Sequence, residues 1–331
     1  MMRLGEIAAM RATVDEAWRS EIADRVGGRW ALDPGSLRWW RSSASHVFVL
    51  PDGVDERGVL YVRFAPASDP AGARLAQGAA LQERLRERSA AVAGPVVSRA
   101  GRVVERVPTA AGEMVAAAVL RVEGEEYDVD DLDEARAFAW GTALAGFHRA
   151  AGPAGAAGAA QSPRHDADLE ALGADPDPRV AAAARTVRTA SRALATGPTV
   201  VGHGDFELDN LRWRSERVVC FDLDESGPMP AVADVAAATR DVFDDWASNP
   251  GAPGLLRSFL SGYEDASGVA VDHRALIVHR AAVAAGSAAA VARAVGEPGP
   301  PPEDLAELAD RLREHEARER QVLVTAAALL G

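Results

Sequence analysis

The 331-residue sequence contains no lysine and a single cysteine. All 36 basic residues are therefore arginines, so the chain can neither form a lysine Schiff base nor contain a G-x-x-x-x-G-K-[ST] phosphate loop. Any cation that contacts phosphate must be an arginine. The one cysteine, Cys220, cannot form an internal disulfide, and its apolar neighbours Val219 and Phe221 indicate a buried strand position rather than a reactive thiol.

Long apolar runs are also missing, because none approaches the roughly 18 residues that a membrane span needs. The N-terminal residues 1–6 include an acidic side chain and lack the apolar core of a signal peptide. The formal net charge of −13 disfavours non-specific nucleic-acid binding, since phosphate contacts need a basic surface. We therefore expect a cytoplasmic protein with neither a nucleic-acid nor a membrane partner.

The first third of the chain reads as a sheet with one internal helix. The whole chain is about twice as long as a typical domain, which favours one two-lobed enzyme or two domains. Helical spacing predicts helices over Met10–Val26 and Leu75–Val92. Short runs typical of strands occur at Leu37–Trp40, His46–Leu50, Val59–Phe64, Pro95–Ser98, Val103–Val107 and Met114–Val122.

The remainder of the chain is dominated by helical patterns. A Gly/Ala/Pro stretch at Ala150–Ala160 is typical of a loop. Helices are predicted over Asp131–His148, Ala231–Trp246, Gly254–Glu264, Asp272–Ala294 and Pro302–Leu330. Three brief strands, Thr199–Val201, Leu211–Trp213 and Val218–Phe221, surround a polar loop between them. This division predicts an α+β fold.

The polar loop holds the residues with the clearest chemical meaning. In a kinase catalytic loop, His-Arg-Asp-x-x-x-x-Asn, the aspartate takes the proton of a substrate hydroxyl and the asparagine binds a metal ion. Asp205 and Asn210 have that spacing, and Asp222 follows a strand, as the second metal ligand does. A single loop aspartate is more often a turn or cap residue, so the spacing of the three carries the prediction.

Three neighbours of this set have simpler interpretations. His203, at the start of the loop, is expected to brace the backbone rather than act as a base. Asp224 is either a further metal ligand or a local cap. Asp234 begins the next helix, where we expect it to support the loop that carries Asp205.

These segments resemble the aminoglycoside phosphotransferase and choline kinase superfamily. Its loop reads His-Gly-Asp-x-x-x-x-Asn, as His203–Asn210 does, and its metal aspartate ends a strand, as Asp222 does. Trp140–His148 is similar to its Leu-Gly-x-x-Leu-Ala-x-Leu-His helix, and Val232–Ala236 to its Tyr-Asp-Leu-Ala helix start. The resemblance, which runs from about residue 37 to 246, implies a protein-kinase-like two-lobed fold. It implies a nucleotide-binding lobe at residues 1–122 and a catalytic and substrate-binding lobe at residues 123–331.

The resemblance also implies a nucleotide site that uses ATP or GTP with Mg²⁺. Arg63 stands where the family usually has lysine, and the glutamate expected to pair with it is replaced by Gln77, with Glu83 and Glu87 nearby. The implied donor-binding residues of the phosphate loop are Ser43, Ser45 and His46. Arg63 is the implied residue of the following strand, and Val119 and Val122 are those of the adenine hinge.

The implied activity is phosphoryl transfer from a nucleotide to a hydroxyl of a small molecule. The acceptor is left open between an amine-bearing antibiotic, an amino alcohol, sugar or nucleoside of metabolism, and an intermediate of secondary metabolism. A nucleotide-binding regulator without turnover is a hypothesis of another class, but such a module would not need the proton acceptor Asp205. A metallohydrolase is disfavoured because the histidines form no H-x-x-x-H pair.

Three acidic residues bear on the acceptor. Asp244 and Asp245 lie three and four positions after Asp241, so a helix would place all three on one broad face. They form either a solvated acidic surface or a pocket wall that attracts an amine-bearing substrate. The choice between ATP and GTP and the oligomeric state are not specified by the sequence.

Overall fold

The computed structural model describes residues 1–153, 163–194, 197–215, 217–243, 254–296, 301 and 303–331. The chain forms two compact units. The first, called the sheet unit, consists of Met1–Glu123, Phe221–Glu225 and Arg293–Leu312. The second, called the helical unit, consists of Gly124–Cys220, Ser226–Ala292 and Arg313–Gly331. The short segment that contains Asp222 therefore clusters with the sheet unit.

The sheet unit is built on six strands that pair antiparallel. Their order is β1-β2-β3-β6-β4, and β5 pairs with β6. The bounds are β1 Arg38–Ser42, β2 His46–Leu50, β3 Leu60–Pro66, β4 Pro95–Val96, β5 Val104–Thr109 and β6 Gly112–Leu120. The six predicted strand segments are thus confirmed, each with shifted or equal ends.

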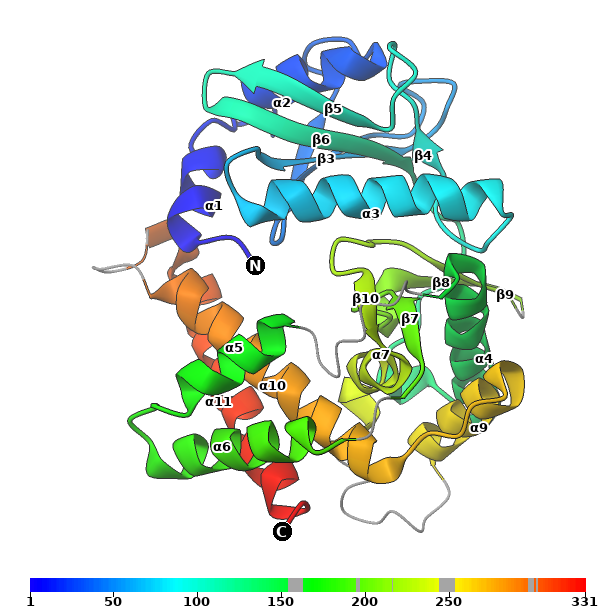
Figure 1. The fold of residues 1–331 in the computed structure, drawn as a ribbon. Coiled ribbons are helices and arrows are strands. Elements are labelled where there is room, and N and C mark those ends of the chain that lie inside the picture. Colours follow the sequence, from blue (N-terminus) through cyan, green and yellow to red (C-terminus); the bar gives the residue numbers. More distant parts are fainter. Residues whose placement is uncertain (154–162, 195–196, 216, 244–253, 297–300, 302) are drawn as a thin grey trace. The chain divides into compact units, whose positions relative to one another are not determined.

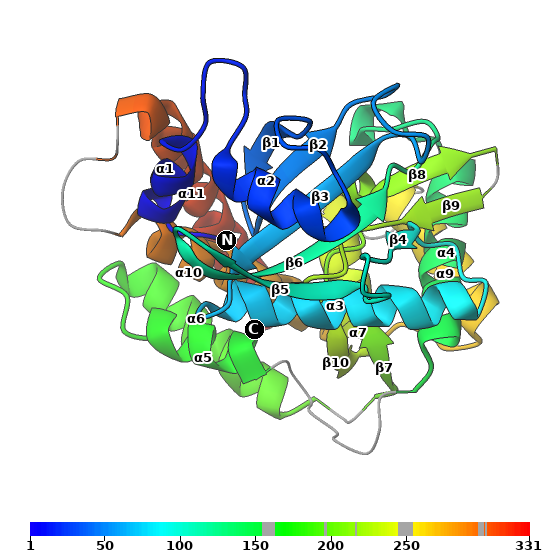
Figure 2. The same cartoon turned by 90° about the horizontal axis from the view of Figure 1, so that it is seen from above.

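Helices lie on both faces of this sheet (Figures 1 and 2). On one face, α2 (Glu21–Gly27) and the 3-10 turn η1 (Gly28–Trp30) bury Val26 and Trp30 against the strand side chains Phe48 and Val62. On the other face lies α3, Pro70–Glu87, whose Leu75 and Ala79 pack on Ala117 of β6. Asp69 caps α3 by accepting the N–H of Ala71 at 2.7 Å.

The helix predicted over Met10–Val26 is wrong. The structure has α1 over Leu4–Arg11 and α2 over Glu21–Gly27, with a non-helical connection between them. In that connection Asp15 Oδ1 accepts the backbone N–H groups two and four residues later, which closes a turn in place of a helix. Trp18 has a φ of 63°, a left-handed conformation that interrupts any helix.

The helical unit contains two groups of helices (Figure 1). In the first, α4 packs along α9, beside α7 and the short strands. In the second, α5, α6, α10 and α11 share a core of alanine, valine and leucine. The helix bounds are α4 Glu134–Ala151, α5 Pro163–Leu172, α6 Pro178–Arg192, α7 Ala231–Ala238, α9 Leu255–Ser267, α10 His273–Val295 and α11 Ala306–Ala328, the last two beginning or ending in the sheet unit. Two antiparallel pairs complete the unit: β7 (Thr199–Gly202) with β10 (Gly227–Pro230), and β8 (Leu211–Arg214) with β9 (Arg217–Cys220).

Glycines allow α4 and α9 to approach closely. An ideal Cβ on Gly141 would lie 2.0 Å from the carbonyl oxygen of Phe259, and one on Gly262 would lie 2.0 Å from that of Phe138. Since no Cβ tolerates such a distance, each helix presents bare backbone to the other at this crossing. The close contact positions His148, near the end of α4, beside Tyr263 of α9.

The helix α10 corrects the expectation that no segment has the length and apolar composition of a membrane span. His273–Val295 meets that test, with a mean hydropathy of 1.6 over its most apolar 18 residues. Of that window, 72% is buried inside the protein. The core helix of a soluble protein passes the same test, so this composition is weak evidence for a membrane.

Candidate active site

A buried carboxylate on α7 supports the loop formed by residues 203–210, which we call the Asp205 loop. Asp234 is fully buried and accepts the backbone N–H groups of His203 and Gly204, each at 2.7 Å. Gly204 has a φ of 81°, which a glycine adopts without strain. The expectation that Asp234 supports this loop is confirmed.

Asp234 is itself held by a chain of hydrogen bonds from α4 and α9. His148 Nε2 lies 2.8 Å from Asp234 Oδ2, and His148 Nδ1 lies 3.0 Å from the hydroxyl of Tyr263. Burial alone would raise the pKa of Asp234, but the hydrogen bonds and the charge of the neighbouring histidines outweigh it and the pKa is lowered. The carboxylate therefore stays ionised and keeps both amides bound.

Asp205 is held from two sides within the helical unit. Asn210 Nδ2 donates to Asp205 Oδ2 at 3.0 Å and to the Asp205 carbonyl oxygen at 3.0 Å. Arg240 Nη1 lies 3.1 Å from Asp205 Oδ1, and the same guanidinium also pairs with Glu207. The Asp205 side chain is 28% exposed, so its oriented carboxylate remains accessible to a substrate hydroxyl.

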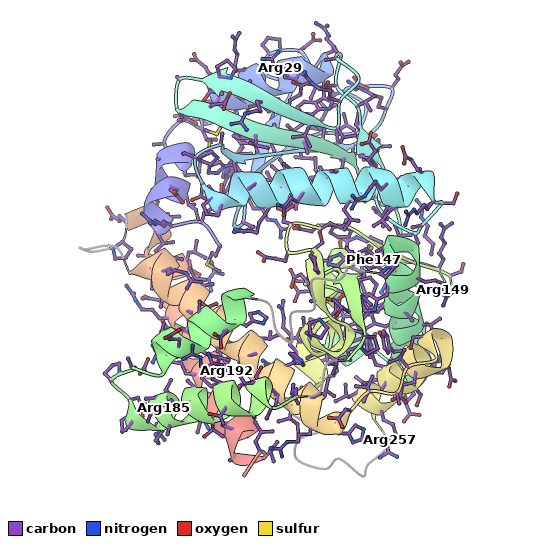
Figure 3. The ribbon with its side chains drawn as sticks, in the orientation of Figure 1. Arg29, Phe147, Arg149, Arg185, Arg192 and Arg257 are labelled. Carbon is purple, nitrogen blue, oxygen red and sulfur yellow. The ribbon has the colours of Figure 1, made fainter. Side chains whose placement is uncertain are left out.

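Aromatic packing anchors the rest of the loop. His203 is fully buried, with its ring centroid 5.4 Å from those of both Phe147 and Phe206. Trp140 donates its indole N–H to the carbonyl oxygen of Phe206 at 3.0 Å. In Figure 3, Phe147 and Arg149 lie on opposite sides of α4, and Arg149 points away from this cluster. The buried position of His203 agrees with a bracing role and is unsuited to a base.

The loop ends in the β8–β9 hairpin, where Leu211 pairs with Cys220. Cys220 is 2% exposed, and its burial raises the pKa of the thiol, which keeps it protonated. The expected buried strand position is confirmed.

Arg63 lies on the face of the sheet that carries α3. It stands opposite Val47 of β2 and Ala117 of β6, and Ala117 packs on α3. Its Nη2 atom lies 2.9 Å from Asp222 Oδ1 and 2.6 Å from Asp224 Oδ2. Burial acts to lower the pKa of Arg63, but the two carboxylates together raise it by more. The pKa is therefore above its ordinary value, and the guanidinium remains charged.

The two carboxylates differ in environment. Asp224 is 6% exposed, and burial raises its pKa to about 6 despite the opposing effect of Arg63. Asp222 is 22% exposed and has a φ of 62°. A left-handed aspartate is uncommon and costs conformational energy, a feature that clusters at functional sites.

The helix α3 packs directly on this segment. An ideal Cβ on Gly78 would lie 2.6 Å from the carbonyl oxygen of Leu223, so only glycine allows the approach. In the described chain, no ion pair joins Arg63 to Glu83 or Glu87, and Gln77 is exposed. The partners of Arg63 are thus the aspartates after β9 rather than a carboxylate on α3.

The predicted phosphate loop forms the turn between β1 and β2. Ser43 is partly buried, and Ser45 is 1% exposed, with an Oγ atom that has no hydrogen-bond partner among the described residues. His46 Nδ1 lies 2.9 Å from Ser42 Oγ, and burial lowers the pKa of His46 to about 4. The neutral His46 ring lies 5.5 Å from that of Phe64, so it belongs to the core of the sheet unit.

The other predicted residues are placed as follows. Val119 lies in β6 opposite Tyr61, and Val122 follows that strand. Asp241 is exposed in the 3-10 turn η4, Arg240–Val242, directly after the arginine that pairs with Asp205. Asp244 and Asp245 lie outside the described residues.

The residues present suit a magnesium ion more than a metal enclosed by protein ligands. Asn210 commits its Nδ2 to Asp205, which leaves Oδ1 as a ligand atom, and Asp222 offers a carboxylate. Among the described residues, no three His, Cys, Asp or Glu side chains are grouped to hold a metal. Mg²⁺ usually takes one or two protein ligands and completes its shell with water and substrate phosphates.

Sequence comparison gives one positive result. The model of the phosphotransferase enzyme family matches residues 42–275, which span the Arg63 strand and the Asp205 loop. No curated protein sequence matches the chain.

Solved structures share the fold at low sequence identity. An amicoumacin kinase with AMP-PNP and Ca²⁺ is 14% identical, with a TM-score of 0.62 over 94% of this chain and 96% of that one. A microcompartment-associated aminopropanol kinase is 18% identical, with a TM-score of 0.62 over 93% and 95%. A spectinomycin phosphotransferase is 12% identical, with a TM-score of 0.58 over 92% and 96%. The protein-kinase-like α+β fold is thereby confirmed.

Proposed function

This chain belongs to the phosphotransferase enzyme family, and from that premise we propose that it transfers the γ-phosphoryl group of ATP or GTP to a hydroxyl of an amine-bearing small molecule. Membership makes it a small-molecule kinase that acts on alcohol groups. We propose in addition which nucleotide and metal it uses, which residues act in the reaction and which class of acceptor it takes.

The observation that carries the residue roles is the position of Asp205. Its two carboxylate oxygens are oriented by Arg240 and Asn210, and its backbone follows two amides held by Asp234. In the proposed reaction the acceptor oxygen bonds to the γ-phosphorus as the bond to the bridging oxygen breaks. The hydroxyl proton passes to Asp205, and the nucleoside diphosphate leaves.

The donor would be held by the sheet unit. Mg²⁺, bound through Asn210 Oδ1 and the Asp222 carboxylate, would supply neutralising charge for the donor phosphates. Arg63, whose Nη2 lies 2.9 Å from Asp222 Oδ1, would keep that carboxylate oriented. The turn of Ser43 and Ser45 would offer hydroxyl and amide groups to phosphate oxygens, and the backbone near Val119 and Val122 would contact the base.

The acceptor class follows from charge. The chain carries a net charge of −13, and Asp241 is exposed beside the arginine that holds Asp205. An exposed carboxylate at this place would attract an amine-bearing acceptor, whereas Asp244 and Asp245 lie outside the described residues. Amicoumacin, aminopropanol and spectinomycin are the substrates named for the three similar structures. A small amino alcohol of metabolism is therefore the alternative to an antibiotic, in which case the enzyme would have no resistance role.

The test is a nucleotide-consumption screen with ATP and with GTP against amino sugars, amino alcohols, nucleosides and macrolides, with product identification by mass. We expect one class to gain a single phosphoryl group, and Asp205→Asn to lose that activity while it still binds nucleotide. Full turnover by Asp205→Asn would overturn the assignment of the proton acceptor. Phosphorylation of neutral or anionic acceptors alone would overturn the acceptor class.

A further inference from the structure

Arg63 has two carboxylate partners, and they are not equivalent. Its Nη2 atom lies 2.6 Å from Asp224 Oδ2 and 2.9 Å from Asp222 Oδ1. The Asp224 side chain is 6% exposed, whereas that of Asp222 is 22% exposed. Asp224 is therefore the closer and more deeply buried partner, and Asp222 is the one that is more accessible to a ligand.

Both carboxylates contact the same nitrogen of the Arg63 guanidinium. Among the residues that the structure describes, Nη1 and Nε of Arg63 make no hydrogen bond. A guanidinium has five N–H donors in a planar fork, so contacts at Nη2 leave the donors at Nη1 and Nε for the oxygens of a ligand. The two aspartates thus fix the direction of the guanidinium without using all of its donors.

The helix α3 limits the movement of the segment that carries Asp224. An ideal Cβ on Gly78 would lie 2.6 Å from the Leu223 carbonyl oxygen and 3.1 Å from the backbone nitrogen of Asp224. One turn earlier on α3, Arg74 Nε lies 3.5 Å from Glu225 Oε1. Contacts with α3 on both sides of the Asp224 backbone therefore keep its carboxylate in place beside Arg63.

A carboxylate on α3 does not do this. Gln77, at the place where a glutamate was expected, is exposed. Asp222 is also an incomplete partner in the proposed reaction, because a carboxylate that binds Mg²⁺ shares its charge with the metal. A buried guanidinium that loses a carboxylate is costly, so Arg63 would then depend on Asp224.

We propose that Asp224 is a positioning residue, which holds the Arg63 guanidinium toward the donor phosphates while Asp222 serves the metal. This role presupposes the nucleotide site proposed above. Asp224 takes the part that a carboxylate on α3 would have, and it is not a metal ligand.

The test is nucleotide binding without metal, because a metal ligand has no effect there. ATP and GTP are titrated into the full chain by isothermal titration calorimetry, first in EDTA and then in Mg²⁺. In EDTA we expect Asp224→Asn to weaken binding at least about fivefold, since Arg63 loses its closer partner. Loss of a negative charge would by itself strengthen the binding of an anion. The matched control is Glu225→Gln, which removes an equal charge one position later and should not weaken binding.

A second pair of variants separates positioning from a general structural role. When Arg63→Ala is already present, Asp224→Asn should change metal-free binding by less than about twofold, because no guanidinium is left to position. A structural role of Asp224 would instead give the same loss with and without Arg63. Asp224→Ser is measured beside Asp224→Asn, and circular dichroism confirms that each variant is folded.

Three results would overturn the role of Asp224. They are parental binding in EDTA by a folded Asp224→Asn or Asp224→Ser, an equal loss with and without Arg63, and parental binding that requires Mg²⁺. The first result, together with weaker binding in Mg²⁺, would make Asp224 a metal ligand. Failure of the parent to bind either nucleotide under both conditions would overturn the proposed function itself, and it is distinguishable because it does not depend on any variant.

Discussion

At the scale of single residues, Asp205 and Asp222 have different tasks in the proposed reaction. Asp205→Ala removes the proton acceptor, and Asp222→Ala removes a metal ligand, so we expect each to lower kcat by about 10²-fold or more. Titration of nucleotide binding against Mg²⁺ should show a much larger loss in Asp222→Ala than in Asp205→Ala. The reverse order would mean that the two roles are exchanged.

Arg63 is the residue through which the sheet unit holds Asp222. In Arg63→Ala the carboxylates of Asp222 and Asp224 lose their shared counter-charge, so we expect a higher nucleotide KM, a lower kcat and a lower Tm. Arg63→Lys keeps a cation, although without the planar fork, and should retain substantial activity. Steady-state kinetics and a thermal melt of both variants test this. Parental values for Arg63→Ala would show that another arginine serves the phosphates.

Arg240 is a positioning residue that the sequence pattern did not reveal. It is 35 residues from Asp205, and only the placement of η4 brings the two together. We expect Arg240→Ala to lower kcat about tenfold, because the Asp205 carboxylate loses one of the two side chains that orient it. The nucleotide KM should change by less than about twofold. Arg179→Ala breaks a surface pair with Asp177 and is the matched control, with unchanged kinetics. Equal effects of the two variants would contradict the role of Arg240.

The residues of the Asp205 loop could be predicted because their chemistry needs a fixed local spacing. Asp205, Asn210 and the supporting Asp234 follow from motif and helix position, and hydrogen bonds confirm the contact of Asp234 with the loop. The partners of Arg63 could not be predicted, since Asp222 and Asp224 are about 160 positions away in sequence. Such a contact depends on how strands and loops pack, which local spacing does not encode.

At the scale of helices and strands, prediction failed where side chains compete with the backbone. Apolar spacing over Met10–Val26 suggested one helix, but Asp15 offers its own acceptor to two N–H groups and ends it. The strand β10, Gly227–Pro230, was missed because its two prolines argue against a strand. It is nevertheless paired with β7, in a two-stranded sheet where each strand is an edge.

The crossing of α4 and α9 gives a stability prediction. Gly141→Ala places a Cβ against the carbonyl oxygen of Phe259, and backbone cannot move as easily as a side chain, so we expect a loss of about 2 kcal/mol or more in the free energy of unfolding. Gly146→Ala, in the same helix, meets nothing within 4 Å and should be neutral or stabilising by about 0.5–1 kcal/mol. Urea denaturation of both variants measures the difference. Equal stabilities would mean that the helices separate there at little cost.

At the scale of the whole molecule, chain order and compact units do not coincide. The sequence predicts a single division, between residues 122 and 123, whereas the long first segment of the sheet unit is Met1–Glu123. Residues 221–225 and 293–312 nevertheless cluster with that unit. The first of these packs on α3 through Gly78, and the second adds Leu305 and Ala309 to a core with Leu4 and Ile7. The sequence has no local signal that places residues 221–225 or 293–312 in the sheet unit, because each placement depends on contacts between distant segments.

Net charge is a property of the whole molecule, and it predicts opposite salt effects on the two substrates. A charge of −13 attracts an amine-bearing acceptor and repels an anionic nucleotide, and added salt screens both interactions. From about 0.05 to 0.5 M NaCl, where the Debye length falls several-fold, we expect the KM of the acceptor to rise and that of the nucleotide to stay level or fall.

Asp241→Asn should reproduce part of the rise in the acceptor KM at low salt. Asp265→Asn, which removes an exposed charge from α9, changes net charge equally and should not. If both variants behave alike, the attraction comes from net charge and Asp241 does not contribute locally. A fall in the acceptor KM with salt would contradict a cationic acceptor.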